Sequence, residues 1–261
     1  MPELPDLEVF KTNVYNRLTS KRLVALEAFN PLKVHLSREA APEAFAGREL
    51  ARIGRVGKEL VFDFGEQKTI AAHLMLNGTI SIVPQEAVGA VRFKIFAMRF
   101  ERETVVFSDM GGLCTIRYMP APDRTPDAFA ETFTLEYFLR IARAKPRVNV
   151  KAFLIDQKVV KGIGNAYVDE ILWAARISPH SLVGKIPEDR MAALYQAIGE
   201  VLRDAVDAIR RIAPDIISGE ERSFLKVHNK ALRKTETGYP IAVERIASKL
   251  TYYTEEQVAY I

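Results

Sequence analysis

The chain has 261 residues, of which 48% are hydrophobic and 27% are charged, a composition typical of a globular protein and not of a disordered one. It has no apolar run of the ~18 residues that a membrane span needs, and its acidic first residues do not resemble a secretion signal. The single cysteine, Cys114, excludes an internal disulfide framework and any zinc site made of several cysteines. We therefore expect a cytoplasmic protein without a membrane anchor.

Residues 6–19 carry apolar residues three to four positions apart, which predicts a helix with one apolar face. From residue 23 to residue 118, apolar and polar residues alternate instead, and Gly, Asn, Asp or Glu separate the alternating runs. Many short strands at regular spacing are typical of a β-sandwich or barrel. The clearest strands are expected over 60–64, 69–74, 79–83, 93–100 and 104–107.

The range 119–127 is polar and rich in proline, which is typical of a linker. Beyond it, helical spacing recurs over 135–144, 148–157, 165–175 and 187–212. The tail has a turn at 238–240 and a β-favouring run over 250–254, which predicts a small hairpin. We predict an α+β protein in four segments: 1–118, a β-sandwich or barrel that begins with a helix; 119–133, a linker; 134–222, a helical domain; and 223–261, a hairpin module.

The net charge of +4 weakly favours a polyanionic partner. The distribution of the charge is more informative, because lysine and arginine crowd the ranges 140–161 and 222–234, where acidic residues are nearly absent. Clustered basic residues of this kind are typical of nucleic-acid binding.

The first residues offer a nucleophile. If Met1 is removed, the ring nitrogen of Pro2 becomes a secondary amine that is partly unprotonated at neutral pH and can attack an electrophilic carbon. Glu3 stands beside it as a proton-transfer partner. An amine that forms an iminium next to a carboxylate can cleave a bond at the anomeric carbon of a sugar. The alternative is that Pro2 and Pro5 only start a helix.

A second motif, Gly162-Ile163-Gly164, separates two predicted helices. Glycines let backbone N–H groups approach a ligand closely, and the N-terminus of the following helix favours anions. Asn165 can cap that helix and offer its side-chain amide to the same anion. Lys158 and Lys161 add positive charge, so a backbone phosphate is the expected guest. The alternative is that the glycines simply turn a helical hairpin.

Four motifs, in this order and spacing, resemble those of the formamidopyrimidine-DNA glycosylase/endonuclease VIII family: Pro2-Glu3-Leu4-Pro5, Gly57-Lys58, His73-Leu74 and Gly162-Ile163-Gly164-Asn165. The similarity runs almost the whole length of the chain. It implies a β-sandwich joined to a helix–two-turn–helix domain, with DNA in the cleft between them. It also implies that a damaged base is flipped out of the duplex, because the glycosidic carbon is unreachable inside the stack.

The resemblance implies a role for each matching residue. Pro2 would attack the anomeric carbon, expel the base and form a Schiff base, and Glu3 would protonate the sugar and assist ring opening. Successive β- and δ-eliminations would then cut both flanking phosphate bonds. Lys58 would contact phosphate near the reaction centre, although a turn lysine can equally be a solvated residue. Asn165 would hold the backbone at the flipped nucleotide.

The chain departs from the family pattern in the C-terminal finger. Residues other than cysteine stand where the family has four zinc ligands: Lys234, Thr237, Thr254 and Gln257. A tetrahedral zinc site cannot be built from them, so we expect no metal and no cofactor. Lys249 stands where the family has a phosphate-binding arginine, which keeps the charge but loses the bidentate fork. We expect this zincless finger to be held by hydrophobic contacts of Tyr239, Leu250, Tyr252 and Tyr253.

The part that reads the base also differs. The range 109–114 matches a family loop that supplies an arginine and an aromatic wedge, but it contains no arginine, and Leu113 replaces the aromatic residue. Leu76 matches the first void-filling residue, and the loop at 219–225 looks truncated. Strong selectivity for guanine lesions opposite cytosine is therefore not expected. Oxidised pyrimidines, ring-opened purines, abasic sites and lesions in single strands are the better candidates.

Three further residues are assigned structural roles. His73 is expected to be a hydrogen-bonding residue of a strand and not a general base, although the resemblance places it among DNA-binding residues. Glu170 is expected to be structural in the second hairpin helix, and Trp173 to belong to the core.

We therefore expect a monomeric, bifunctional DNA glycosylase and AP lyase of base excision repair that acts on damaged double-stranded or single-stranded DNA near the bacterial nucleoid. The alternative is a catalytically lapsed DNA-binding protein that senses damaged or abasic DNA. Retention of Pro2, Glu3 and Lys58 disfavours this alternative, whereas loss of the void-filling loop favours it. The N-terminal chemistry also disfavours a third possibility, a ribosomal-type RNA-binding protein.

Overall fold

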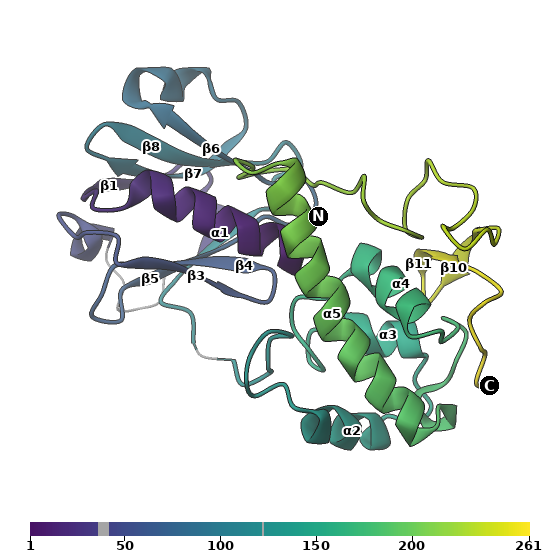
Figure 1. Ribbon diagram of the computed structural model, residues 1–261. Helices are drawn as coiled ribbons and strands as arrows, with labels where there is room; N and C mark the ends of the chain where they lie inside the picture. The colour runs from purple at the N-terminus through teal and green to yellow at the C-terminus, as the bar shows by residue number, and fades with distance from the viewer. Residues whose placement is uncertain (36–41, 122) are drawn as a thin grey trace. The chain divides into compact units, whose positions relative to one another are not determined.

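The computed structural model describes residues 1–35, 42–121 and 123–261. They form two compact units, the first made of residues 1–123 and 209–220 and the second of residues 124–208 and 221–261 (Figure 1). The predicted helical domain and finger thus share one unit, and the stretch 209–220 belongs with the β-rich unit. The predicted linker 119–133 crosses from the first unit to the second, and its Pro122 lies outside the described residues. Within the described ranges, no helix is long and apolar enough to cross a membrane.

The first unit is a β-sandwich that begins with helix α1 (Leu4–Leu18). One sheet has the order β1 (Leu23–Ala28), β7 (Lys94–Phe100), β8 (Glu103–Ser108) and β6 (Thr79–Pro84). The other has the order β2 (Val34–His35), β9 (Thr115–Tyr118), β5 (Thr69–His73), β4 (Glu59–Asp63) and β3 (Arg52–Val56). All named strand pairs are antiparallel except β2 with β9. Three short 3-10 helices cover Pro31–Lys33, Pro42–Phe45 and Gln85–Ala90.

The core of this unit lies between the two sheets and includes the apolar face of α1. Alternate residues of β4, including Phe62, point inward, as the period of a strand requires. The Phe62 ring meets the edge of Phe107 from the other sheet at a centroid distance of 5.9 Å, so the sheets pack face to face. The predicted sandwich is confirmed, and so is the helical stripe of Leu7, Phe10, Val14 and Leu18, all fully buried.

The second unit contains α2 (Leu135–Ala144), α3 (Val150–Ile155), α4 (Asn165–Ala174) and most of α5 (Glu188–Ile212), with a 3-10 turn at Val183–Lys185. Two of these helices begin where the sequence supplies a capping side chain. Thr134 accepts the N–H of Tyr137 before α2, and Asn149 accepts two backbone N–H groups before α3. The cap explains why α3 begins at residue 150 and not at the predicted 148.

The finger, residues 223–261, contains the antiparallel hairpin of β10 (Ala242–Ile246) and β11 (Lys249–Tyr253). The predicted turn near Gly238 exists, with φ of 89° at that glycine, but it precedes β10. The turn that joins the two strands is Ala247-Ser248, with φ of 50° and 63°. Two-residue hairpin turns with positive φ at both positions favour Asn and Gly, so neither Ala247 nor Ser248 predicts this turn from the sequence.

Candidate active site and nucleic-acid interface

The predicted site residues divide between the two units. The β-sandwich unit holds the predicted catalytic and void-filling residues: Pro2, Glu3, Lys58, His73, Leu76 and Leu113. The helical unit holds the predicted phosphate-binding residues: Lys158, Lys161, Gly164, Asn165 and Lys249.

Pro2 and Glu3 are both buried at the start of α1. Glu3 is the N-cap of this helix and forms a capping box with Asp6: the Glu3 N–H donates to Asp6 Oδ2 at 2.8 Å, and the Glu3 carboxylate accepts the N–H of Asp6. The capping box fixes the carboxylate of Glu3, the residue that follows Pro2, on the first turn of α1. The ammonium group of Met1 forms an ion pair with Glu220. While Met1 is attached, the nitrogen of Pro2 is an amide and cannot act as a nucleophile.

Lys58 lies in the two-residue turn between β3 and β4, where Gly57 has φ of 60°. Only 9% of Lys58 is exposed, so the alternative of a solvated turn lysine is wrong. His73 of β5 pairs with Glu59 of β4, directly after this turn. Burial lowers the pKa of His73, and Lys58 adds to this effect while Glu59 opposes it. The turn thus brings the ammonium group of Lys58 close to a neutral imidazole.

The orientation of His73 is set by its hydrogen bond to the following turn. Its Nδ1 accepts the N–H of Met75 at 2.9 Å, which leaves the proton of the neutral ring on Nε2. Leu76, next in the turn, is 58% exposed. A Cβ on Gly78 would lie 2.2 Å from the carbonyl oxygen of Leu74, so only glycine allows this turn to close. The turn therefore presents an apolar side chain outward from a rigid support.

The loop 109–114 is organised by one buried carboxylate. Asp109 accepts the backbone N–H groups of Gly111, Leu113 and Cys114 at 2.6–2.8 Å. Leu113 is 38% exposed and Met110 is 75% exposed. The loop presents two apolar side chains and no cationic one. Sequence reasoning missed Met110, because its position matched no void-filling residue.

In the second unit, Gln157 shapes the turn that carries the glycine motif. Its side chain accepts the N–H of Gly162 at 3.0 Å and donates to the carbonyl oxygen of Ile163 at 2.9 Å. Gly164 is the N-cap of α4 and Lys158 is exposed, whereas Lys161 is half-buried. Sequence reasoning placed Gln157 only at the end of a helix and missed this role.

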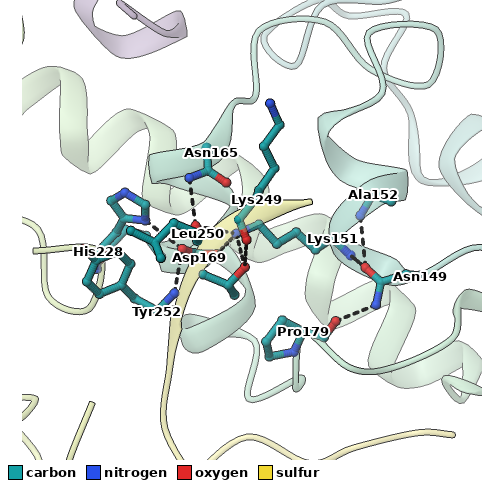
Figure 2. A network of polar contacts seen from close by, with 12 residues as sticks. Asn149, Lys151, Ala152, Asn165, Asp169, Pro179, His228, Lys249, Leu250 and Tyr252 are labelled. Atoms are coloured by element: carbon teal, nitrogen blue, oxygen red, sulfur yellow. Dashed lines mark hydrogen bonds and ion pairs between the residues drawn. The ribbon is translucent and has the colours of Figure 1, made fainter. Parts of the chain in front are cut away.

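Asn165 does not cap α4, which corrects one expectation. Its Nδ2 instead donates to the carbonyl oxygen of Leu250 in the hairpin at 2.9 Å (Figure 2). The reason is that Gly164 already occupies the N-cap position, so the Asn165 side chain is free to reach the strand. Lys249, next to Leu250, is exposed and points away from the buried contacts in Figure 2. The hydrogen bond therefore joins the start of α4 to the tip of the finger.

The basic range 140–161 is not a simple positive patch. Lys151 is fully buried and its Nζ lies 2.7 Å from Oδ1 of Asp169. Lys145 pairs with Asp156 at 2.8 Å, and this hydrogen bond, with others, outweighs burial and lowers the pKa of that carboxyl group. Two of the clustered lysines are therefore structural, because carboxylates that lie close in space neutralise them.

The expected hydrophobic support of the finger is present only in part: Tyr252 and Tyr253 are half-buried, and their rings lie 4.5 and 5.3 Å from those of His228 and His180. Tyr239 and Leu250 are 40% and 44% exposed. Polar contacts add to this support: the carboxylate of Glu256 accepts hydrogen bonds at 2.9–3.1 Å from Trp173 Nε1, Thr237 Oγ1 and Thr254 Oγ1, and it forms an ion pair with Arg176 Nη1 at 2.6 Å. In the part of the chain that the structure describes, no three His, Cys, Asp or Glu side chains gather as a metal site.

Glu170 and Trp173 have the structural roles expected of them. The carboxylate of Glu170 accepts three successive backbone N–H groups, from residues 226–228, at 2.7–3.0 Å. Burial raises the pKa of Glu170, and the three donors oppose that rise. Trp173 is 6% exposed and donates to Glu256. Both side chains therefore attach the C-terminal segment to α4.

Comparisons with known proteins agree with this architecture. The family model for the formamidopyrimidine-DNA glycosylase N-terminal domain matches residues 1–116, and the one for the formamidopyrimidine-DNA glycosylase H2TH domain matches residues 125–213. The formamidopyrimidine-DNA glycosylase of Lactococcus lactis subsp. lactis (strain IL1403) is 28% identical over 271 residues, covering 97% of each chain. That of Carboxydothermus hydrogenoformans is 29% identical over 241 residues, covering 88% of this chain and 89% of the relative.

Solved structures show the same fold. A crystal structure of a Lactococcus lactis Fpg mutant in complex with DNA containing Fapy-dG has a TM-score of 0.85 and 25% identity, covering 98% of this chain and 99% of that one. The complex of Lactococcus lactis Fpg with DNA containing an abasic site also has a TM-score of 0.85, at 24% identity and the same coverage. With both family models matched in order over the two units, the chain belongs to the formamidopyrimidine-DNA glycosylase family.

Proposed function

We propose that Pro2 is the nucleophile and Glu3 the proton-transfer group of this enzyme. As a member of its family, it is a bifunctional DNA glycosylase and AP lyase of base excision repair. After Met1 is removed, the Pro2 nitrogen attacks the anomeric carbon, the glycosidic bond breaks and the base leaves. Glu3 then donates a proton to the ring oxygen of the sugar, the bond from that oxygen to the anomeric carbon breaks, and the Pro2 nitrogen becomes part of an iminium. The iminium acidifies the neighbouring carbon, so loss of a proton there expels one flanking phosphate by β-elimination, and a second proton loss expels the other by δ-elimination. The observation that carries the proposal is the capping box, which fixes the carboxylate of the residue that follows Pro2 at the buried start of α1.

Two groups in the same unit would support the reaction. We assign Lys58 to a phosphate near the reaction centre, because this residue of a tight turn is only 9% exposed and does not extend into solvent as a turn lysine usually does. His73 is neutral and held by the N–H of Met75, so it can offer its Nε2–H to DNA as a hydrogen-bond donor. Neither role requires a metal or a cofactor.

The second unit would hold the DNA backbone. Gly164 and Asn165 stand at the N-terminus of a ten-residue helix, where the positive end of the helix dipole favours an anion. Lys249 stands at the hairpin tip beside Asn165, and the exposed Lys158 adds charge at the same turn. Lys161 is half-buried and would contribute mainly to the local field. These contacts carry no base preference, so they set affinity and position.

We propose a lesion range wider than guanine lesions opposite cytosine. Leu76 and Leu113 would fill the void left by the flipped base, and neither side chain can hydrogen-bond to the orphaned base. The glycines at 111 and 112 leave the loop without any donor side chain at its tip. Oxidised pyrimidines, ring-opened purines and abasic sites fit this apolar wedge, in duplex or in single strands. We further propose that one copy of the chain acts alone, in the cytoplasm beside the nucleoid.

Borohydride trapping tests the nucleophile directly. The protein with Met1 removed should give a covalent complex with DNA that carries an abasic site, and Pro2→Gly and Glu3→Gln should each abolish base excision. Pro5→Ala, in the same first turn of α1, is the matched control and should still be trapped. A chain that retains Met1 should bind the DNA without being trapped.

Two outcomes would count against the proposal. Undiminished base excision by Pro2→Gly would show that another group is the nucleophile. Tight, salt-dependent binding by the processed protein without trapping or cleavage would instead show a lapsed enzyme that only senses damage. Oligonucleotides with single defined lesions, each opposite all four bases, would then measure the lesion range.

A further inference from the structure

One face of α4 is bonded to the finger along its length. Asn165, Asp169 and Trp173 follow one another at four-residue spacing, so their side chains lie one above another on the helix. Asn165 donates to the Leu250 carbonyl at 2.9 Å, and Trp173 donates to Glu256 at 3.1 Å. Between them, Asp169 Oδ2 accepts the N–H of Tyr252 at 3.0 Å. The finger is therefore attached to the helix whose first turn is the proposed phosphate site.

Asp169 is the centre of this attachment, as Figure 2 shows. Its Oδ1 lies 2.7 Å from Nζ of Lys151, and the side chains of both residues are fully buried. The same Nζ donates to Thr251 Oγ1 at 2.7 Å, and Asp169 Oδ2 also lies 2.6 Å from Nδ1 of His228. One buried carboxylate thus connects α3, α4, the 226–228 segment and strand β11.

A buried ion pair contributes little net free energy to the joining of these segments. The desolvation of two charges largely offsets their attraction, and apolar side chains of the same size often hold a fold as well. What the pair adds is specificity for one register of the strand, because each of its bonds requires a particular partner atom. A slip of β11 by one residue would lose the bond to Tyr252 and reverse the faces of the strand, including that of Lys249.

We propose that Asp169 is a positioning residue for Lys249: the buried Lys151–Asp169 pair holds β11 in register on α4, so that Lys249 and Asn165 bind the same stretch of DNA backbone. This inference rests on the proposed role of Lys249 in phosphate binding. In Figure 2 the Lys249 side chain extends beside Asn165, away from the buried pair. Asp169 touches no DNA and acts only through the strand that it holds.

A double-mutant cycle between Asp169→Asn and Lys249→Ala tests the inference on abasic duplex DNA. Lys249→Ala alone should weaken binding by about fivefold and lower the slope of log K against log salt by about 0.9, the loss of one phosphate contact. Asp169→Asn should lower the slope by the same amount. Adding Lys249→Ala to it should then weaken binding by less than about twofold, because a mispositioned lysine has little left to lose.

The controls separate positioning from a general loss of structure. Glu255→Gln changes an exposed carboxylate two residues after the end of β11 and should leave affinity and slope unchanged. The excision rate at saturating DNA should fall less than about twofold in Asp169→Asn while KM rises, since the chemistry is in the other unit. If Asp169→Asn leaves Lys151 unpaired and fails to fold, Lys151→Met with Asp169→Asn removes both charges of the pair and gives the same test.

The outcomes distinguish the inference from the proposed function. Independent, additive effects of Asp169→Asn and Lys249→Ala, or an unchanged salt slope in Asp169→Asn, would overturn the role of Asp169 while leaving Lys249 in place. An unchanged affinity in Lys249→Ala would instead remove Lys249 from the proposed interface.

Discussion

Replacing Glu256 with glutamine should destabilise the finger without any metal being involved. The carboxylate accepts hydrogen bonds from Trp173 at 3.1 Å, Thr254 at 3.1 Å and Thr237 at 2.9 Å, and it pairs with Arg176 at 2.6 Å. Glutamine has nearly the same shape, but it is uncharged and offers one acceptor oxygen in place of two. The NH2 group that replaces the second oxygen therefore meets a hydrogen-bond donor and cannot accept its hydrogen bond.

The size of the effect follows from these contacts. A hydrogen bond to a charged group contributes roughly 1.5–3 kcal/mol and a neutral one roughly 0.5–1.5 kcal/mol, so each of three bonds loses about 1 kcal/mol. The Arg176 side chain is 39% exposed, and its ion pair adds less than about 1 kcal/mol. The threonine hydroxyls can rotate and accept from the new NH2 group, which recovers part of the loss. We expect a net cost of about 2 kcal/mol, or a melting temperature lower by about 4–8 °C.

The assay follows the chain's only tryptophan, which is itself a donor to Glu256. Thermal unfolding monitored by tryptophan fluorescence compares Glu256→Gln with Glu255→Gln, the exposed neighbour, each with and without a chelator. The wild-type midpoint should not respond to the chelator. A midpoint for Glu256→Gln within about 1 °C of Glu255→Gln, or a wild type destabilised by chelation, would refute the reasoning.

Two further predictions concern the first unit. Folding lowers the pKa of His73 below 6.5, so the unfolded chain binds the proton more readily and stability is lost as pH falls below about 6.5. His73→Asn, whose Oδ1 can accept the same backbone N–H, should therefore show a smaller fall in melting temperature between pH 7.5 and 5.5 than the wild type. An equal fall in both proteins would contradict this. Gly78→Ala places a Cβ 2.2 Å from the Leu74 carbonyl oxygen, so the turn that carries Leu76 must open. The rate of excision from duplex DNA should then drop by on the order of 10- to 100-fold, and the rate from single-stranded DNA should drop much less. Gly89→Ala, where a Cβ meets no atom within 4 Å, is the control, and an equal loss on both substrates would exclude the void-filling role of Leu76.

The sequence by itself determined the elements whose signals are local. Apolar spacing defined α1 and the strands of the sandwich, because each pattern directly reflects the period of its element. The order of the four short motifs also predicted the family, which both family models confirm. Pro2 and Glu3 stand out because their chemistry depends on their place in the chain and not on a distant partner.

Only the tertiary structure decided how the finger is held and how the glycine turn is shaped. Asn165 and Leu250 are 85 positions apart, Trp173 and Glu256 are 83 apart, and no local pattern connects them. Lys151 reads as part of a basic cluster until the fold places Asp169 against it. Periodicity and turn propensity report short-range preferences, whereas a buried charge or amide finds its partner only when distant segments pack together.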